Sequence, residues 1–195
     1  MFDYTQDIKN YIELEREVLS KLDVEQINKA INELVRTQEE GNTVYVFGNG
    51  GSGSTSSHFQ NDFNKGLSEH LDKKFNFCCL NDNMSTLTAI ANDSSYEEVF
   101  KFQLEGHLKP GDVVMALSGS GNSKNIIKAV EYAKENGNTV IGITGYNGGK
   151  LKEMCDISLH VPVNSMQMSE DIHMIFDHLM MSVLYLRMCG INHVR

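Results

Sequence analysis

The sequence has few prolines and no excess of basic charge. Two prolines among 195 residues leave little room for a disordered linker. The 17 lysines and arginines are scattered among 26 aspartates and glutamates, and the formal net charge is -9. Nucleic-acid backbones are held by clustered basic residues, so this balance disfavours a nucleic-acid partner and leaves open only a locally positive pocket.

The cysteines and apolar segments also lack the patterns of a secreted or membrane protein. Cys78, Cys79, Cys155 and Cys189 form no CxxC pair and no regular disulfide framework. No segment reaches the roughly 18 uninterrupted apolar residues of a membrane span. The N-terminus mixes acids with apolar residues, unlike a signal peptide. We therefore expect reduced thiols, no membrane partner and a cytoplasmic location.

The length and apolar content fit one domain with a sizeable core. The chain has 195 residues, of which 41% are hydrophobic. Apolar residues recur at helical spacing from Tyr4 to Leu22. A second amphipathic helix is expected after Asp23, where Gln26 stands three residues on, as in a capping box. Residues 1–40 are thus expected to form N-terminal helices at an oligomer interface, as part of the same domain as residues 41–195.

Beyond residue 41, apolar strands alternate with helices. The expected strands are Thr43–Gly48, Phe75–Leu80, Asp112–Ser118, Thr139–Gly145 and Ile157–Pro162. The expected helices are Ser54–Leu67, Met84–Ala91, Tyr96–Leu104, Ile126–Gly137, Gly149–Met154 and Met168–Met188. Continuous apolar strands between helices indicate a parallel sheet covered on both faces. With right-handed crossovers, the sequence predicts an α/β fold, a three-layer αβα sandwich around a doubly wound sheet of five parallel strands.

Two loops rich in glycine and serine, residues 48–54 and 118–123, each join an expected strand to an expected helix. In such sheets ligands bind beyond the carboxyl ends of the strands, where glycines admit a ligand to the backbone and helix N-termini attract anions. Neither loop matches the P-loop or the GxGxxG fingerprint, so a nucleotide is disfavoured. The loops could be tight turns with good helix caps, but their recurrence favours a phosphate monoester site.

Five segments resemble a known family, in the same order along almost the whole chain. They read GNGGSGSTSSHF, NDSSYEEVF, SGSGNSKNIIKA, TGYNGGKL and EDIHMIFDHL, and they resemble the sugar isomerase (SIS) domain, within it the sedoheptulose 7-phosphate (phosphoheptose) isomerases. The resemblance implies interconversion of sedoheptulose 7-phosphate and D-glycero-D-manno-heptose 7-phosphate through an enediol, for bacterial surface heptose in lipopolysaccharide or capsule. It also implies a homotetramer with active sites shared between subunits, and zinc or another divalent metal, one per subunit.

The resemblance further implies a set of site residues. The substrate-binding residues would be Asn49, Gly50, Gly51, Ser52, Asp62, Asn92, Asp93, Ser118, Gly119, Ser120, Ser123 and Glu170. The metal ligands would be His58, Asp62, Glu170 and His178, and the catalytic residues Asp62 and His178. Two positions depart from the family pattern, since Asp62 is one methylene shorter than the usual Glu and Glu170 replaces a neutral Gln. The ligand set is therefore more anionic.

Residue spacing is compatible with that metal set. His58 and Asp62 are four residues apart and share a helix face, whereas Glu170 and His178 are eight apart, about 80° around the axis. Two imidazoles and two carboxylates suit zinc or another divalent metal. A histidine on a helix is nevertheless more often packed or capped than a ligand. We expect His173 to face away from the set and Asp177 to be a solvated or interface charge.

An aldose-ketose isomerisation requires a base near the carbon, an acid near the carbonyl oxygen and stabilisation of the oxyanion. Asp62 and His178 would share the first two tasks, and a divalent ion the third. Two other functions stay open at this point. One is a non-catalytic SIS module that binds a sugar phosphate or a protein, and the other is an isomerase of a pentose or hexose phosphate.

Overall fold

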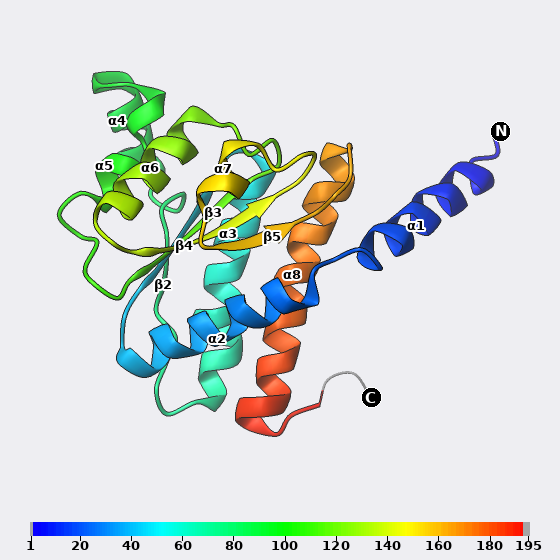
Figure 1. Ribbon diagram of the computed structural model, residues 1–195, viewed down its shortest axis with the longest axis horizontal. Coiled ribbons are helices and arrows are strands. Elements are labelled where there is room, and N and C mark those ends of the chain that lie inside the picture. The colour runs from blue at the N-terminus through cyan, green and yellow to red at the C-terminus, as the bar shows by residue number, and fades with distance from the viewer. Residues whose placement is uncertain (1, 193–195) are drawn as a thin grey trace.

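The computed structural model describes residues 2–192, whose strands form a sheet with the order β2-β1-β3-β4-β5 (Figure 1). All four neighbouring pairs are parallel. The strands are β1 (Val44–Gly48), β2 (Phe77–Cys79), β3 (Val113–Ser118), β4 (Thr139–Thr144) and β5 (Ile157–His160). The predicted sheet of five parallel strands is confirmed.

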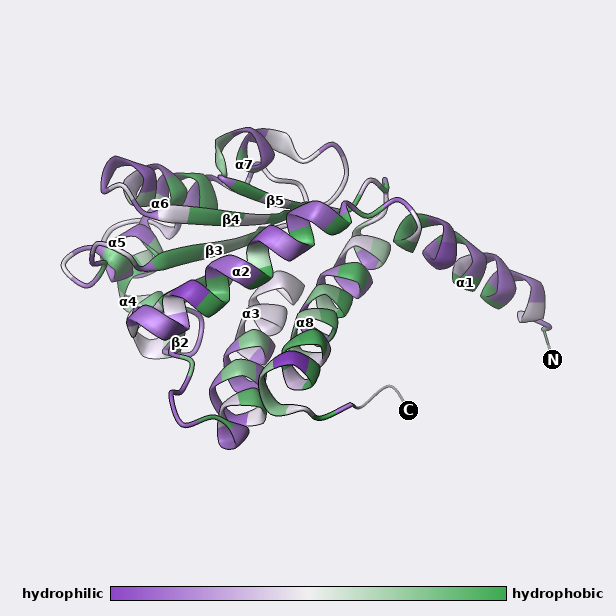
Figure 2. Cartoon of the chain, turned by 60° about the horizontal axis from the view of Figure 1, so that its bottom comes forward, coloured by the Kyte–Doolittle hydropathy of each residue, from purple (hydrophilic) through white to green (hydrophobic). Residues whose placement is uncertain are grey.

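Helices cover both faces of the sheet, as Figure 2 shows from the side. One face packs against α2 (Val24–Glu40), α3 (Gly51–Asn61) and α8 (Met166–Cys189). The other packs against α4 (Met84–Asp93), α5 (Lys101–Leu104), α6 (Lys124–Glu135) and α7 (Gly149–Met154). The three-layer sandwich is therefore confirmed, while α1 (Thr5–Leu19) extends away from it (Figure 1).

Several element boundaries differ from the prediction for local physical reasons. The expected helix at 54–67 begins earlier, at Gly51, and its α-helical part ends at Asn61, beyond which η1 (Asp62–Leu67) is π-helical. The second strand is shorter than expected because Phe75 donates its amide to the Ser68 hydroxyl (2.9 Å) rather than to a strand. The expected helix at 96–104 is divided into η3 (Tyr96–Glu98), a 3-10 turn, and the short α5.

The capping box predicted at Asp23 forms in part. The Asp23 carboxylate accepts hydrogen bonds from the amides of Glu25 and Gln26 at 3.0 and 3.1 Å. The Gln26 side chain accepts a hydrogen bond from the Ser158 amide in β5 (3.1 Å). It thus ties α2 to the edge of the sheet.

Neither a membrane-spanning helix nor a disulfide is found among residues 2–192. Within residues 2–192, no helix combines the length and apolar character required to traverse a bilayer. All four cysteines are free thiols, and burial raises the pKa of Cys79 to about 11.

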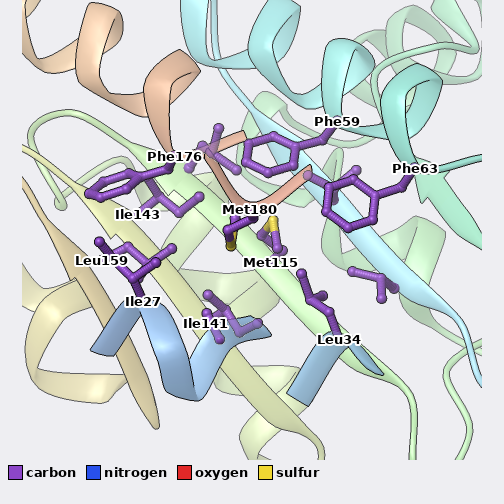
Figure 3. Close-up of a cluster of buried hydrophobic side chains, with 14 of the residues drawn as sticks. Ile27, Leu34, Phe59, Phe63, Met115, Ile141, Ile143, Leu159, Phe176 and Met180 are labelled. Carbon is purple, nitrogen blue, oxygen red and sulfur yellow. The ribbon is translucent and has the colours of Figure 1, made fainter. Parts of the chain in front are cut away.

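A buried aromatic and aliphatic cluster joins α3, α8 and α2 to one face of the sheet (Figure 3). Phe63, the residue after Asp62, is fully buried. Its ring stacks on Phe77 with a centroid distance of 4.5 Å and meets Phe75 edge-on at 5.3 Å. The core therefore determines where the backbone of Asp62 lies.

Replacing Phe63 with alanine should lower the free energy of unfolding by about 3–5 kcal/mol, because the change removes a fully buried ring and leaves a cavity. Phe102, which is 57% exposed, provides the matched control, and Phe102→Ala should change stability by no more than about 0.5 kcal/mol. Urea unfolding of both variants measures the difference. Equal losses would contradict the placement of Phe63 in the core.

Candidate active site

The two glycine-rich loops lie where the direction of the chain connections reverses. β1 and β3 are neighbours in the sheet, but α3 follows β1 on one face and α6 follows β3 on the other. In a sheet of order 2-1-3-4-5 this switch point is where ligands bind, beyond the carboxyl ends of the strands. The loops therefore lie at the carboxyl ends of the strands, as the sequence predicted.

The first loop is held by three side chains that the sequence analysis did not identify. Asn81, just after β2, accepts from the Gly48 amide (3.2 Å) and donates to the Gly48 carbonyl (2.8 Å). The amides of Asn49 and Asn125 exchange two hydrogen bonds of 2.9 Å, and the Tyr96 hydroxyl donates to Asn49 at 2.8 Å. The sequence does hold a signal for Asn81, because it is a polar residue that directly follows an expected strand.

A pocket of about 410 Å³ opens beside this loop, lined by Asn49, Gly50 and Tyr96 among others. Ser52 is buried beneath the loop. The expected substrate residues Asn92 and Asp93 are exposed at the end of α4, where the Asn92 amide donates to the Asp93 carboxylate (2.8 Å). Ala91, next to them, lines the pocket, so this pair lies near its rim.

The second loop is tied to the loop after β4. The Gly119 carbonyl accepts from the Gly145 amide (2.9 Å), and the Gly121 carbonyl accepts from the Leu151 amide (3.0 Å). The Ser118 hydroxyl is buried and lies 3.3 Å from the Ser123 hydroxyl. The loop is thereby preorganised by backbone contacts rather than by charged groups.

Ser120 faces a second pocket, of about 550 Å³, shared with Asn122, Tyr146, Asn147 and Asn164. Tyr146 has a φ of 48°, the one positive φ among non-glycine residues of the described chain. Residues held in this region carry a conformational cost and cluster at ligand sites. The sequence gives no signal for Tyr146, because such a conformation is expected of glycine.

Three of the four predicted metal ligands meet between α3 and α8. The His58 Nε2 atom lies 3.2 Å from His178 Nε2 and 3.4 Å from the Asp62 carboxylate, and His178 Nε2 lies 3.8 Å from that carboxylate. The Asn61 amide donates to Oδ1 of Asp62 (3.0 Å), and Oδ2 faces the imidazoles. Asp62 also begins the π-helical segment, a distortion frequent at functional sites.

The fourth residue of this cluster is Asp177, whose ligand atom lies within 4.8 Å of those of His58, Asp62 and His178. The interpretation of Asp177 as a solvated or interface charge is wrong, because its side chain is 0% exposed. Burial, and then the charge of Asp62, raises the pKa of Asp177 to about 8. Asp177 directly precedes His178, so on helix periodicity the two side chains point about 100° apart, and the sequence offers no signal that they share a site.

Glu170 lies elsewhere, at the N-terminus of α3. A Cβ atom added to Gly51 would overlap the Glu170 carboxylate, so the two residues are in close contact. His173 is fully buried outside the cluster, in agreement with the prediction that it faces away, and burial lowers its pKa to about 4.

The group of His58, Asp62, Asp177 and His178, called the His/Asp cluster below, opens into a different pocket from the two loops. Asp62 and His178 line a third hollow of about 300 Å³, together with Met181, Ser182 and Tyr185. Eleven residues separate Gly51 from Asp62, which corresponds to about 16 Å along a helix axis. Within one chain, the loop groups and the His/Asp cluster therefore stand apart.

Comparison with known proteins identifies the class. Residues 3–145 match the SIS domain family. The probable phosphoheptose isomerase of Thermoplasma volcanium is 36% identical over 181 residues, which cover 91% of this chain and 90% of that protein. The phosphoheptose isomerase of Aliarcobacter butzleri is 36% identical over 160 residues, covering 82% and 84%.

Solved structures agree with this result. A phosphoheptose isomerase from Neisseria gonorrhoeae superposes with a TM-score of 0.85 at 28% identity, over 93% of this chain and 98% of that one. One from Francisella tularensis gives 0.85 at 27% identity, over 94% and 98%. The chain belongs to the phosphoheptose isomerase family of SIS domain proteins.

Gly121→Ala should destabilise the second loop, because the added Cβ would overlap the carbonyl oxygen of Gly148 at a residue whose φ is 65°. Gly106→Ala is the matched control, with a φ of 75° and no heavy atom within 4 Å of the added Cβ. Both variants strain the backbone, but Gly121→Ala should lose about 1–3 kcal/mol more stability from the overlap. Urea unfolding of the two variants measures this, and equal losses would contradict the described loop contact.

Proposed function

We propose that the chain is an isomerase that interconverts sedoheptulose 7-phosphate and D-glycero-D-manno-heptose 7-phosphate through an enediol, for bacterial surface heptose synthesis. The observation that carries the proposal is the meeting of His58, Asp62 and His178 between α3 and α8. These groups supply an acid, a base and metal ligands in a chain whose relatives are phosphoheptose isomerases. A module that only binds sugar phosphates has no chemical need for them.

The two loops would hold the phosphate of the open-chain sugar. Their amides, the hydroxyls of Ser118, Ser120 and Ser123, and the N-termini of α3 and α6 offer donors and positive dipole ends to an anion. Substrate binding by Ser52, Asn92 and Asp93 stays a prediction, which rests on the family resemblance. Binding energy at the phosphate would position the reacting carbons at the other end of the sugar.

Asp62 and His178 would move the proton. The amide of Asn61 orients the Asp62 carboxylate, so that Oδ2 faces the pocket shared with His178. The His178 side chain is 55% exposed and can therefore reach a substrate oxygen. In this division of roles, Asp62 would take the proton from one carbon and return it to the next, while His178 would protonate the carbonyl oxygen and then accept the proton of the neighbouring hydroxyl, which regenerates the acid.

The donor set fits a divalent cation such as zinc. Two imidazole nitrogens and a carboxylate oxygen, which are donor types that zinc binds, lie 3.2–3.8 Å apart. When bound, such an ion polarises a carbonyl group as a Lewis acid. Metal binding by Glu170 stays a prediction, since its carboxylate contacts Gly51 rather than these three side chains.

Activity should be tested with ketose phosphates of seven, six and five carbons, with and without added zinc, and the products identified by NMR. The proposal predicts conversion of sedoheptulose 7-phosphate into heptose 7-phosphate. Turnover of the shorter sugars alone would favour the pentose or hexose phosphate isomerase. Binding without turnover of any of the three would favour the non-catalytic module.

Asp62→Asn and His178→Gln should each lower turnover by about two orders of magnitude or more, because each removes a group that transfers a proton. Asp72→Asn and His107→Gln, at exposed positions away from the pocket, are matched controls expected to retain activity. Melting curves of all four establish that they fold. Folded Asp62 and His178 variants with the turnover of the parent would contradict the assigned roles.

We also propose that the active site is completed in a homotetramer through the N-terminal helices. The helix α1 exposes Ile8 (58%) and Ile12 (52%) and projects from the sandwich, to which the Tyr11 hydroxyl ties it by donating to Asp171 of α8. Apolar surface of this kind favours self-association, and the separate pockets of one chain suit a site shared between subunits.

Light scattering should give the mass of a tetramer of the 21.9 kDa chain. Ile8→Lys with Ile12→Lys should lower both the assembled mass and the isomerase activity, since charge at a buried contact opposes association. Lys9→Ala, also on α1, is the control and should affect neither. A fully active monomer would contradict the shared site.

A further inference from the structure

Asp177 is a buried carboxylate without a hydrogen-bond partner. Its side chain is 0% exposed, and neither carboxylate oxygen accepts a hydrogen bond from any described residue. Burying a carboxylate in this way is costly unless a positive group compensates it. Within residues 2–192, the one basic side chain within 4.0 Å is His58, whose Nε2 lies 4.0 Å from Oδ2 of Asp177. A cation at this position would stabilise the ionised carboxylate.

The donor atoms around Asp177 are arranged as the ligands of one ion would be. His58 Nε2 lies 3.2 Å from the nitrogen of His178, 3.4 Å from Asp62 Oδ2 and 4.0 Å from Asp177 Oδ2. All four ligand atoms lie within 4.8 Å of one another. Ligands placed tetrahedrally about 2.0–2.2 Å from zinc are separated from one another by about 3.3–3.6 Å. The four side chains thus approach a tetrahedral set.

We propose that Asp177 is the fourth protein ligand of the metal, in place of Glu170, an inference that rests on the metal site of the proposed function. The ligands would be His58, Asp62, Asp177 and His178, which lie where α3 and η1 pack against α8. Two carboxylates and two neutral imidazoles balance the charge of a divalent cation, whereas adding the carboxylate of Glu170 would leave a net negative centre.

The position of Glu170 agrees with this assignment. Its carboxylate contacts Gly51, and seven residues, or about 10 Å of helix axis, separate Gly51 from His58. At the N-terminus of α3 the helix dipole stabilises a negative charge. Glu170 is thus stabilised by the N-terminus of α3, whereas neither oxygen of the buried Asp177 carboxylate accepts a hydrogen bond from a described residue.

Zinc affinity of the full-length chain gives the first test. We expect Asp177→Asn to weaken zinc binding by at least about tenfold, measured by competition with a chromophoric chelator. Asp171→Asn, an exposed carboxylate on the same helix, should bind zinc as the parent does. Glu170→Gln should lose less affinity than Asp177→Asn. Parental affinity in Asp177→Asn, or a larger loss in Glu170→Gln, would overturn the proposal.

Cobalt provides a second test that depends on direct contact and holds even if Asp177→Asn folds poorly. Asp177→Cys keeps a ligand atom at the position, so its cobalt(II) form should show a thiolate-to-metal charge-transfer band. The parent, whose four cysteines lie outside the cluster, and Asp171→Cys should show no such band. Stoichiometric cobalt binding by Asp177→Cys without the band would overturn the proposal.

The outcomes separate this inference from the proposed function. A parent chain that binds neither zinc nor cobalt would contradict both the metal site and the role of Asp177. Metal affinity that is the same in the parent and in the Asp177 variants would contradict this inference alone. Metal binding that depends on Asp177, without turnover of any sugar phosphate, would contradict the isomerase alone.

Discussion

The packing of α3 against α8 over one face of the sheet holds the acidic and imidazole side chains together. The residues next to the polar ones carry this contact, since Phe63 follows Asp62 and Phe176 precedes Asp177, and both rings are buried in the same core (Figure 3). Hydrophobic burial thus determines the backbone positions, and the polar groups are placed as a consequence. This packing leaves the Asp177 carboxylate buried and without a hydrogen-bond partner among residues 2–192.

The sheet imposes a second constraint, on the phosphate loops. Because β1 and β3 are adjacent and their helices diverge to opposite faces, the two loops must open at the same edge. The His/Asp cluster lies further along α3, in a separate pocket. In the proposed assembly another chain would contribute groups to each site, which links the proposed chemistry to the proposed oligomer.

The sequence predicted the strands, the layers and the meeting of His58 with Asp62, because these follow from local periodicity. Other features depend on tertiary packing. The π-helical turn at Asp62, the positive φ of Tyr146 and the contact of Glu170 with Gly51 have no local signature. Asp177 was expected to be a solvated or interface charge, and only the close approach of α3 to α8 buries it beside His58, Asp62 and His178. Whether the family's substrate residues act in this chain stays a prediction.

Solvent isotope exchange tests the central claim most directly, namely that the chain catalyses an aldose-ketose isomerisation through an enediol. The zinc-treated protein is incubated with sedoheptulose 7-phosphate in deuterium oxide, and the product is analysed by NMR. Proton transfer by a side chain that exchanges with solvent predicts heptose 7-phosphate with deuterium at C2. No heptose product, or no deuterium at C2 of the product or C1 of the remaining substrate even after many turnovers, would contradict the account.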